Sequence, residues 1–562
     1  MKLKKLLLIA IIPMMLSGCV GTYDLGVVDL PYYDQSDETV GFNRNLFYDN
    51  NLDTVAADPT VIYVSKEENL EYGGYFYLYG TTGNTTTIGC WRSADLANWS
   101  PFSTAFIPSE NSWSKRSLWA PDISYDAEIG KYILAYSGTN LNPNLNPEKK
   151  SISFAISDNP GGPFKEITGY DAHGNYIDEN TPVINVLGIK DIHPDYNFEK
   201  NGYIDIHIFN DPVSQDRYAY MVRGTGRNNQ IVGMKMIDWL TPDYSTYTIL
   251  TEVNKTTVGG DEVTEFFEDW LNEGPDVIYH NGKYYLLCSV NETTDKMYTV
   301  IQAVGDTPLG PFTKIQQSEG GLVLSPENEW DHVNCSGHNS HIKVGDELFI
   351  VYHQFIDRQY ASSTIRGIAI DRLVWYTRDD GLELLKAVGP TYSPQPLPAE
   401  ISGYKNIAPL ATVSATGVFE GQDLSTINDG AVRLHDIDVI DELLGDGVVS
   451  ITLDFDHYVK AKALLLYNTY DFDSAFYHVA RIDFSFKTQV EGKNATGTAR
   501  IENLYYDFDK WSDADAEMIR PGAPLIVEFD ELDINSVTVT FVCPRGQEYI
   551  SISEIMLLGR DI

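Results

Sequence analysis

The sequence has few cysteines and few basic residues. The cysteine spacing argues against a zinc site, and the shortage of basic residues argues against nucleic-acid binding. The 562 residues include five cysteines. Besides Cys19, these are Cys90, Cys288, Cys335 and Cys543. These four show neither a CxxC pair nor zinc-site spacing, so we expect buried free thiols, with disulfides as the alternative that spacing cannot establish. Forty Lys and Arg against 80 Asp and Glu give a net charge of −40, which repels phosphate backbones and excludes nucleic acid as a partner.

The N-terminus has an apolar run that is too short to span a bilayer. Three lysines precede this run, residues 6–16, which is the pattern of an export signal. The run ends in Leu-Ser-Gly-Cys at residues 16–19, which resembles the lipobox of bacterial lipoproteins. The resemblance implies cleavage before Cys19 and lipidation of its thiol. The protein would then contact the membrane through a lipid anchor only, in the bacterial cell envelope, at the outer membrane, facing the periplasm or the surface. An ordinary signal peptide with a chance cysteine is the alternative.

Helical periodicity is nearly missing, and a short aromatic strand recurs instead. Its five copies are residues 74–79, 131–136, 217–222, 283–288 and 347–352. A second echo, ending in Gly-Pro-Phe, relates residues 155–164 to 303–312. Strand repeats of this length predict radial repetition, and five copies predict a five-bladed β-propeller over residues 46–395. A pair of β-sandwiches is the competing all-β fold, but it does not explain the Gly-Pro-Phe echo.

The flanking segments complete an all-β chain. Residues 20–45 lack periodicity and are interpreted as a tether with the lead-in to the first strand. The proline-rich residues 392–398 mark a linker. Beyond it, residues 403–562 contain alternating runs that predict a β-sandwich of the jelly-roll kind.

Four carboxylates precede strands of successive repeats. They are Asp58, Asp122, Asp205 and Glu273. Equivalent positions in the blades of a propeller face one axis, so we expect these side chains to converge there. Crowded carboxylates push their pKa values apart, which suits separate acid and base roles in glycoside hydrolysis. The alternatives are a turn-capping Asp58 and a solvated Glu273.

Four short segments follow one another in a recognisable order. They are Ala-Asp-Pro-Thr at 57–60, Trp-Ala-Pro-Asp at 119–122, Glu-Gly-Pro at 273–275 and Ser-Gly-His-Asn-Ser at 336–340. On these segments the propeller region resembles glycoside hydrolase family 43. The resemblance implies an inverting O-glycosyl hydrolase that acts on plant-type polysaccharides or their oligosaccharides. An exo-acting α-L-arabinofuranosidase or β-xylosidase is the expected activity.

The resemblance also implies the role of each acid. Asp58 would be the general base that activates water, and Glu273 the general acid. Asp205 would be the third carboxylate, which raises the pKa of the acid and orients it. The family usually has Ile-Asp-Pro at this last site, whereas this chain has Ile-Asp-Ile, so Asp191 and Asp195 are alternatives.

Other residues of the resembling segments are expected around the sugar. Trp119, Asp122 and Arg366 are assigned to substrate binding, with a core tryptophan, a structural Asp122 and an exposed arginine as the alternatives. His338 resembles a histidine of the central channel, where a calcium ion with mostly water ligands is often found. One histidine is a poor calcium signature, so a hydrogen-bonded histidine is equally expected. No cofactor is required for the reaction.

The C-terminal segment resembles a second known module. Residues 406–409, 428–430 and 551–555 resemble the discoidin, or coagulation-factor type C, sandwich, which in many sugar-cleaving enzymes binds carbohydrate. The usual tryptophan after Asp-Gly is missing, so a module that merely packs against the propeller is the alternative.

Two other functions stay open at this point. One is a fructan-type propeller glycosidase that retains configuration, whose Arg-Asp-Pro and Glu-Cys signatures are not found. The other is a non-catalytic, glycan-binding surface lipoprotein, against which the intact Asp58 and Glu273 argue.

Overall fold

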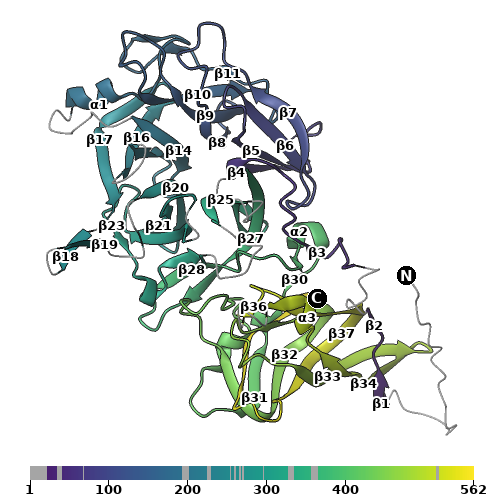
Figure 1. Cartoon of the computed structure of the whole chain (residues 1–562). Helices are drawn as coiled ribbons and strands as arrows, with labels where there is room; N and C mark the ends of the chain where they lie inside the picture. The colour runs from purple at the N-terminus through teal and green to yellow at the C-terminus, as the bar shows by residue number, and fades with distance from the viewer. Residues whose placement is uncertain are drawn as a thin grey trace.

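The computed structural model describes residues 22–33, 41–67, 69–192, 202–224, 229–253, 255–258, 261–264, 268, 271–294, 297–326, 335–355, 365–513 and 518–561. Cys19 and Asp195 lie outside these residues, and lipidation of Cys19 therefore stays a prediction. Within them, no helix combines the length and the apolar character needed to cross a membrane. The fold is nearly all β-structure, a ring of sheets followed by a second β unit (Figure 1).

The ring consists of five antiparallel sheets, so the predicted five-bladed propeller is confirmed. Blade 1 contains β4 (Ala57–Val64), β5 (Tyr75–Thr81), β6 (Ile88–Ser93) and β7 (Ser100–Phe106). Blade 2 contains β8 (Trp119–Asp126), β9 (Lys131–Thr139), β10 (Lys150–Ser157) and β11 (Lys165–Glu166). Blade 3 contains β14 (Tyr203–Asn210), β15 (Arg217–Arg223), β16 (Gln230–Asp238) and β17 (Thr241–Glu252). Blade 4 contains β20 (Asn272–His280), β21 (Lys283–Val290), β22 (Thr299–Gly305) and β23 (Phe312–Lys314), with β24 (Leu322–Leu324) beside β22. Blade 5 contains β25 (Gly337–Val344), β26 (Glu347–Phe355), β27 (Arg366–Thr377) and β28 (Glu383–Ala387).

The innermost strand of every blade has the same irregularity. The pairing of β4, β8, β14, β20 and β25 with the next strand skips two residues, which is a β-bulge. The first skipped residue has a left-handed backbone in all five blades: Asp58, Ala120, Asp205, Gly274 and His338, with φ between 40° and 57°. Such a conformation is uncommon for residues other than glycine. The bulge therefore releases one backbone N–H per blade from the strand ladder, next to the axis.

The bulge corrects the predicted equivalence of the four acids. Asp58 and Asp205 do occupy matching positions. Glu273, however, comes one residue before the bulge residue of β20, and Asp122 comes two residues after that of β8. Side chains alternate faces along a strand, and the bulge shifts this alternation, so a position judged only by distance from the strand can be wrong by one or two residues.

The Gly-Pro-Phe echo has a structural role that is repeated between blades. The hydroxyl of Tyr220 in blade 3 donates to the carbonyl of Pro308 in blade 4 at 2.8 Å. The hydroxyl of Tyr79 in blade 1 makes the corresponding bond to the carbonyl of Pro160 in blade 2. The echo thus marks the seam where one blade packs against the next.

The ring closes between its first and last blades. Residues 54–56 run beside the start of β27, where Ile368 N donates to Thr54 O at 3.0 Å and Ala56 N donates to Arg366 O at 3.1 Å. Farther out, β3 (Phe47–Tyr48) pairs with β29 (Gln395–Pro396). β29 lies inside residues 392–398, so this predicted linker is itself buried and hydrogen-bonded.

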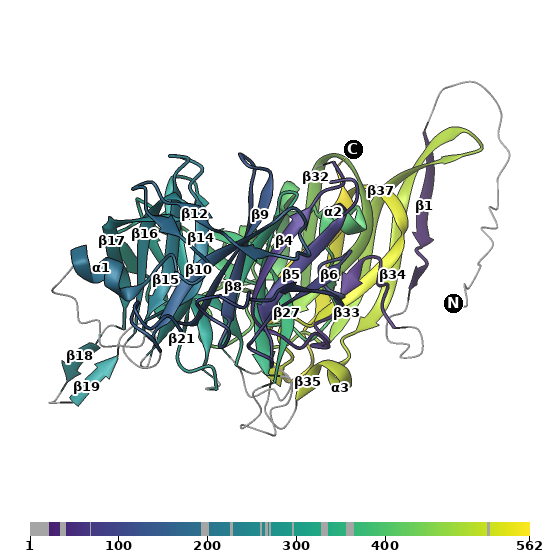
Figure 2. The same ribbon diagram turned by 90° about the horizontal axis from the view of Figure 1, so that it is seen from above.

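The second unit is built on one nine-stranded sheet that bends into a sandwich. Its strands are β1 (Tyr23–Asp29), β2 (Tyr32–Tyr33), β30 (Lys405–Asn406), β31 (Thr412–Val418), β32 (Leu443–Asn468), β33 (His478–Val490), β34 (Lys493–Tyr505), β37 (Pro524–Val542) and β38 (Ile550–Arg560). The long β32 and β37 pair along most of their length, and a large apolar core lies between the layers. β1 pairs in parallel with β34 (Figure 2), and β2 pairs with β37. Residues 20–45 are therefore not a tether throughout, because part of them extends this sheet.

The remaining elements are short. Helices are α1 (Val186–Ile192), α2 (Ala399–Ser402) and α3 (Phe508–Trp511), with 3₁₀ turns η1 (Gln317–Glu319), η2 (Ala408–Leu410) and η3 (Leu424–Ile427). Three hairpins join β12 (Gly169–Tyr170) to β13 (Tyr176–Ile177), β18 (Lys255–Val258) to β19 (Asp261–Thr264), and β35 (Ser512–Asp513) to β36 (Met518–Ile519).

The two units share a core. One apolar cluster combines propeller residues with sandwich residues, namely Leu46, Phe47 and Val388 with Val432, Leu434 and Tyr467 among others. Beside it, Lys386 of β28 forms an ion pair with Asp438 of the sandwich, N to O 2.6 Å, and both side chains are at most 2% exposed. An apolar interface with a buried ion pair is typical of units that move together.

Candidate active site

Asp58 lies at the bulge of β4, and three side chains of blade 5 surround it. Arg366 Nη1 donates to Asp58 Oδ1 at 3.1 Å, and His338 Nδ1 lies 3.3 Å from the same oxygen. The backbone N–H of Asp58 donates to Nδ1 of His353 at 3.2 Å. Burial raises the pKa of the Asp58 carboxyl, but His338 and the permanent charge of Arg366 outweigh it and hold this pKa well below its usual range. Asp58 is therefore ionised at neutral pH.

Glu273 stands before the bulge of β20 in the opposite electrostatic state. The hydroxyl of Tyr298, next to the start of β22, donates to Glu273 Oε1 at 2.8 Å. Burial and the negative charge of Asp58 raise the pKa of Glu273 to about 7, although Tyr298 and Arg366 act against the shift. Glu273 thus holds a proton up to neutral pH while Asp58 does not.

Asp205 joins these two acids from blade 3. The backbone N–H of Gly274 donates to Asp205 Oδ2 at 3.4 Å, which ties Asp205 to the residue after Glu273. Burial, then the charges of Glu273 and Asp58, raise the pKa of Asp205. Two acids in one buried site cannot both be ionised at low cost, so the pair retains a proton. The alternative Asp191 lies exposed near the end of α1, away from this group.

Asp122 lies one level deeper in the channel and does not join the three acids. Thr60 Oγ1 donates to Asp122 Oδ1 at 3.0 Å and Ile208 N donates to Oδ2 at 2.7 Å. Both carboxylate oxygens are thus engaged by blades 1 and 3. This arrangement indicates a structural Asp122, which was the alternative to substrate binding.

The same deeper level contains a row of alternating histidines and carboxylates. His207 Nδ1 lies 3.7 Å from Asp122 Oδ2, and His207 Nε2 lies 3.6 Å from Asp276 Oδ1. His341 Nδ1 lies 2.7 Å from the same Asp276 oxygen, and Asn339 donates to the other at 3.0 Å. Asp122, His207, Asp276 and His341 thus connect blades 2 to 5 below the three acids.

Trp119 occupies the position in blade 2 that Glu273 occupies in blade 4, and Lys150 lies against its side chain. Trp119 comes one residue before the bulge of β8, as Glu273 does in β20. It is half-buried, and Lys150 Nζ lies 3.2 Å from the centroid of one of its rings. Burial lowers the pKa of Lys150 to about 7, against the raising effect of Asp205. Trp119 therefore lies beside the acids. Its partial exposure is compatible with both predictions, a contact with the sugar and a core tryptophan.

The predicted cation site beside His338 has a poor set of ligands. Among the described residues, no group of three or more His, Cys, Asp or Glu side chains is placed to hold a metal ion. His338 Nδ1 faces Asp58, and burial lowers the pKa of its ring. Calcium favours six to eight oxygen ligands, so these residues do not form a protein-ligated site. A calcium ion held through water stays a prediction, and no step below uses one.

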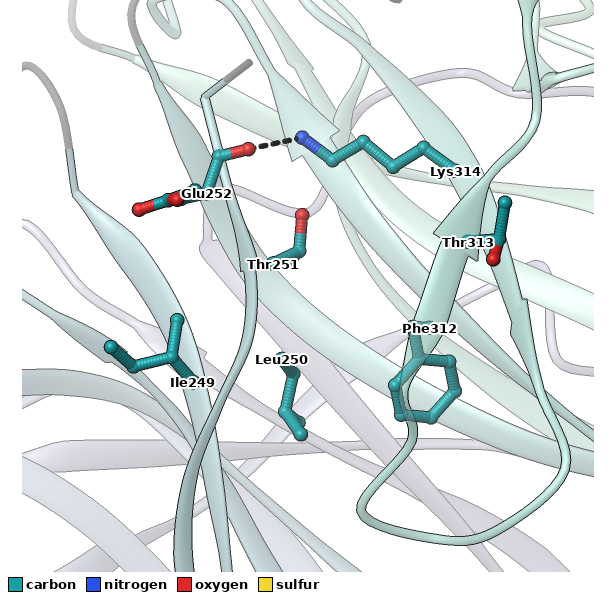
Figure 3. Close-up of a pocket in the computed structure, with 7 residues that line it drawn as sticks. All are labelled: Ile249, Leu250, Thr251, Glu252, Phe312, Thr313 and Lys314. Carbon is teal, nitrogen blue, oxygen red and sulfur yellow. Dashed lines mark hydrogen bonds between the residues drawn. The ribbon is translucent and has the colours of Figure 1, made fainter.

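A separate pocket opens at the outer edge of blades 3 and 4 (Figure 3). It is lined by Ile249, Leu250, Thr251, Glu252, Phe312, Thr313 and Lys314. Lys314 Nζ donates to the carbonyl of Glu252 at 2.6 Å across this pocket. It contains none of the three acids.

Comparison with known proteins now decides the family. A family model described as glycosyl hydrolases family 43 matches residues 52–186 and 189–382, more than half of the chain. The chain belongs to this family. The family 43 chain is therefore an inverting O-glycosyl hydrolase.

Relatives of the family 43 chain include enzymes of several named activities. It is 26% identical over 354 residues to beta-D-galactofuranosidase xynD of Aspergillus niger, covering 59% of this chain and 85% of that protein. The crystal structure of a thermostable family-43 glycoside hydrolase is 27% identical with a TM-score of 0.47, covering 62% of this chain and 99% of the other. The alpha-L-arabinofuranosidase of Lactobacillus brevis is 20% identical with a TM-score of 0.42, covering 60% and 95%.

Several residues of the site were not identified from the sequence. Asp276 had a signal, since Gly-Pro-Asp at 274–276 repeats Ala-Pro-Asp at 120–122. His207 follows Asp205 by two residues, as Asp122 follows Ala120. His353 and Tyr298 had no such signal, because His353 lies in the second strand of blade 5 and Tyr298 lies just before the third strand of blade 4, away from the innermost strands.

Proposed function

We propose that this protein is an exo-acting glycosidase in which Asp58 is the general base and Glu273 the general acid. One observation supports the assignment most directly. The two carboxyls lie in one buried site, and their pKa values are shifted in opposite directions, Asp58 downward and Glu273 to about 7. At neutral pH the site therefore contains both a carboxylate and a carboxylic acid, which inversion requires.

In the proposed reaction, Asp58 removes a proton from a water molecule, and this water attacks the anomeric carbon. Glu273 donates its proton to the leaving glycosidic oxygen as the bond breaks. Inversion requires a gap of roughly 6.5–9.5 Å between the two carboxyls to admit the water. Arg366 holds Asp58 as an anion, and Asp205 opposes ionisation of Glu273 and orients it.

The proposed substrates are terminal α-L-arabinofuranosides or β-xylosides of plant-type polysaccharides and oligosaccharides. The similarity to a beta-D-galactofuranosidase adds β-D-galactofuranosides to this set. All are compact sugar rings, and a few contacts to hydroxyl groups distinguish one from another. The half-buried Trp119 and the Arg366 guanidinium are the proposed sugar contacts.

The location and the second unit complete the proposal. Lipidation at Cys19 would attach the enzyme to the bacterial cell envelope. The C-terminal sandwich is proposed to be discoidin-like and to act as a rigid support of the propeller. The shared apolar cluster and the buried Lys386–Asp438 pair support this role.

The test is hydrolysis of aryl α-L-arabinofuranoside, β-D-xylopyranoside and β-D-galactofuranoside, with oligosaccharides of the same sugars beside them. Glu273→Gln should lower turnover of the oligosaccharides by about 10²–10⁴-fold, since a carboxamide cannot donate the proton. Aryl substrates with good leaving groups should lose less. Asp191→Asn, which changes an exposed acid, is the matched control and should keep full activity.

Two results would contradict the proposal. If the wild type releases no sugar from any of these substrates, the proposed substrate class is wrong. If proton NMR of the first product shows retained anomeric configuration, a fructan-type mechanism replaces inversion.

A further inference from the structure

His353 is a fully buried histidine that contacts the base but is not one of the expected catalytic residues. It lies in β26 of blade 5, with 0% of its surface exposed. Its Nδ1 accepts the backbone N–H of Asp58 at 3.2 Å. Its Nε2 lies 3.5 Å from Thr293 Oγ1 and 3.4 Å from Arg366 Nη1. One ring thus contacts the base, the arginine that pairs with the base, and blade 4.

The hydrogen bond to Asp58 determines the protonation state of this ring. A backbone N–H can only donate, so Nδ1 must be without a proton. In the neutral ring the proton is then on Nε2, where the Thr293 hydroxyl can accept it. Burial, then the charge of Arg366, lowers the pKa of His353 well below its ordinary value, so the neutral ring is the stable form.

The backbone N–H of Asp58 needs this acceptor. The bulge removes Asp58 from the ladder between β4 and β5, and Asp58 has φ of 50°. A buried N–H without a partner costs about 1–3 kcal/mol, and a left-handed non-glycine residue adds strain. Without an acceptor at this point, the bulge would be free to relax and to turn the carboxylate away from Arg366.

The other face of the ring leads to the acid. The His353 ring stacks on the ring of Tyr298, with centroids 5.9 Å apart and planes 18° from parallel. The Tyr298 hydroxyl donates to Glu273 Oε1 at 2.8 Å. A continuous set of contacts therefore runs from the base, through His353 and Tyr298, to the acid.

We propose that His353 is a positioning residue, which holds the backbone of Asp58 through its Nδ1 and sets the placement of the base relative to Glu273 through its contact with Tyr298. The inference rests on the proposed function, in which Asp58 and Glu273 act on opposite sides of one sugar. His353 transfers no proton and contacts the reaction only through these partners.

Two substitutions at His353 distinguish the role of Nδ1 from that of Nε2. In His353→Asn, the amide oxygen is attached to the same carbon as Nδ1 in histidine, so it can accept the N–H of Asp58. In His353→Gln, the amide is one carbon farther and reaches the place of Nε2 instead. We expect H353N to keep kcat within about fivefold of the wild type, whereas H353Q loses about 10²-fold in kcat, because a misplacement of about 1 Å has a cost of this size. KM should change less than threefold in both.

The control is the neighbouring Tyr352→Phe, which removes an equally buried hydrogen bond, to Asp371 at 2.6 Å, without contacting the acids. It should keep kcat within twofold. Melting temperature and circular dichroism are measured for every variant. If H353Q does not fold, His353→Ala, which also lacks an acceptor, replaces it and should show the same loss.

The outcomes separate this inference from the function on which it rests. Equal kcat values for H353Q and wild type, or equal losses in H353N and H353Q when both are folded, overturn the role of His353 and leave the glycosidase assignment standing. A wild-type protein that hydrolyses none of the glycosides overturns both. A loss in H353Q that H353N restores, at constant KM, supports the positioning role.

Discussion

Arg366 Nη1 and Asp58 Oδ1 lie 3.1 Å apart and form an ion pair between the last and the first blade of the ring. The Arg366 side chain is 22% exposed and the Asp58 side chain 10%, so solvent screens the pair only in part. Arg366 is charged at every pH at which the protein is folded. The ring closure of the propeller is therefore also the means by which the base is kept ionised.

Arg366→Gln should move the acid limb of the pH profile. Loss of the guanidinium removes one of the groups that lower the pKa of Asp58 against its burial, so this pKa rises. The limb of kcat/KM on the acid side should move upward by about one to three pH units. Arg372→Gln, in the same strand but paired with Glu347, is the control and should leave the limb in place. An unmoved limb in R366Q would mean that Arg366 only binds sugar.

Tyr298→Phe should move the alkaline limb to higher pH. Activity falls as Glu273 loses its proton, at a pKa of about 7. The Tyr298 hydroxyl stabilises the ionised Glu273, so its removal raises this pKa further, by about one to two units. The measurement is kcat/KM against pH on an unactivated oligosaccharide. A shift to lower pH would show that Tyr298 does not donate to Glu273 in the working enzyme.

Asp205→Asn should move the same limb in the opposite direction. The charge of Glu273 raises the pKa of Asp205, and because the repulsion within this buried pair is mutual, the ionisation of either acid opposes that of the other. With asparagine at 205, Glu273 titrates alone and loses its proton at lower pH, so turnover at neutral pH falls. The pair of profiles, one shifted upward by Y298F and one downward by D205N, is the result to look for. An unchanged limb in D205N would remove Asp205 from the control of the acid.

The propeller could be predicted from the sequence because its repeats are local. The strands that recur, such as residues 283–288, combine aromatic and apolar side chains within a few residues, and turn signals such as Asn281-Gly282 precede them. Each blade is a simple up-and-down sheet, so five copies were enough to predict the ring. The family resemblance added the order of the acids, which composition did not provide.

The features of the site that could not be predicted from the sequence depend on contacts between blades. The β-bulge shifts Glu273 by one residue relative to Asp58, and nothing in the segment around Glu273 announces this shift. Nothing in the segments around His353 and Tyr298 shows that packing between blades places them between the base and the acid. The strand Tyr23–Asp29 is short and exposed along much of its length, so its pairing with the C-terminal sheet left no clear hydrophobic signal.

The row of charges beneath the acids predicts a pH-dependent stability. Burial lowers the pKa of His207, but the nearby carboxylates of Asp122 and Asp276 outweigh it and raise this pKa above its ordinary value. A histidine with a raised pKa in the folded state contributes stability that is complete below about pH 6.5 and is lost as the pH rises through the folded pKa. His207→Gln should therefore cost more free energy of unfolding at about pH 6 than at about pH 9. Denaturant unfolding followed by tryptophan fluorescence measures this, with the exposed His173→Gln as the control. A cost independent of pH would mean that His207 is neutral throughout.

The buried pair between the two units should make them depend on each other. Lys386 Nζ lies 2.6 Å from Asp438 Oδ1, and Asp438 also accepts from Ser325 and from the backbone of Leu434. Lys386→Met leaves the Asp438 charge buried without its cation, at a cost of about 3–5 kcal/mol in the free energy of unfolding.

Lys283→Met is the matched control for this cost, because Lys283 pairs with Asp306 at the same 2.6 Å while both side chains are well exposed. Its loss should cost less than about 1 kcal/mol. If the propeller and the sandwich act as one unit, K386M should lower the melting temperature of both together, since the pair lies in the core that they share. A variant in which only the sandwich melts early, with full glycosidase activity remaining, would show that the propeller does not need this support.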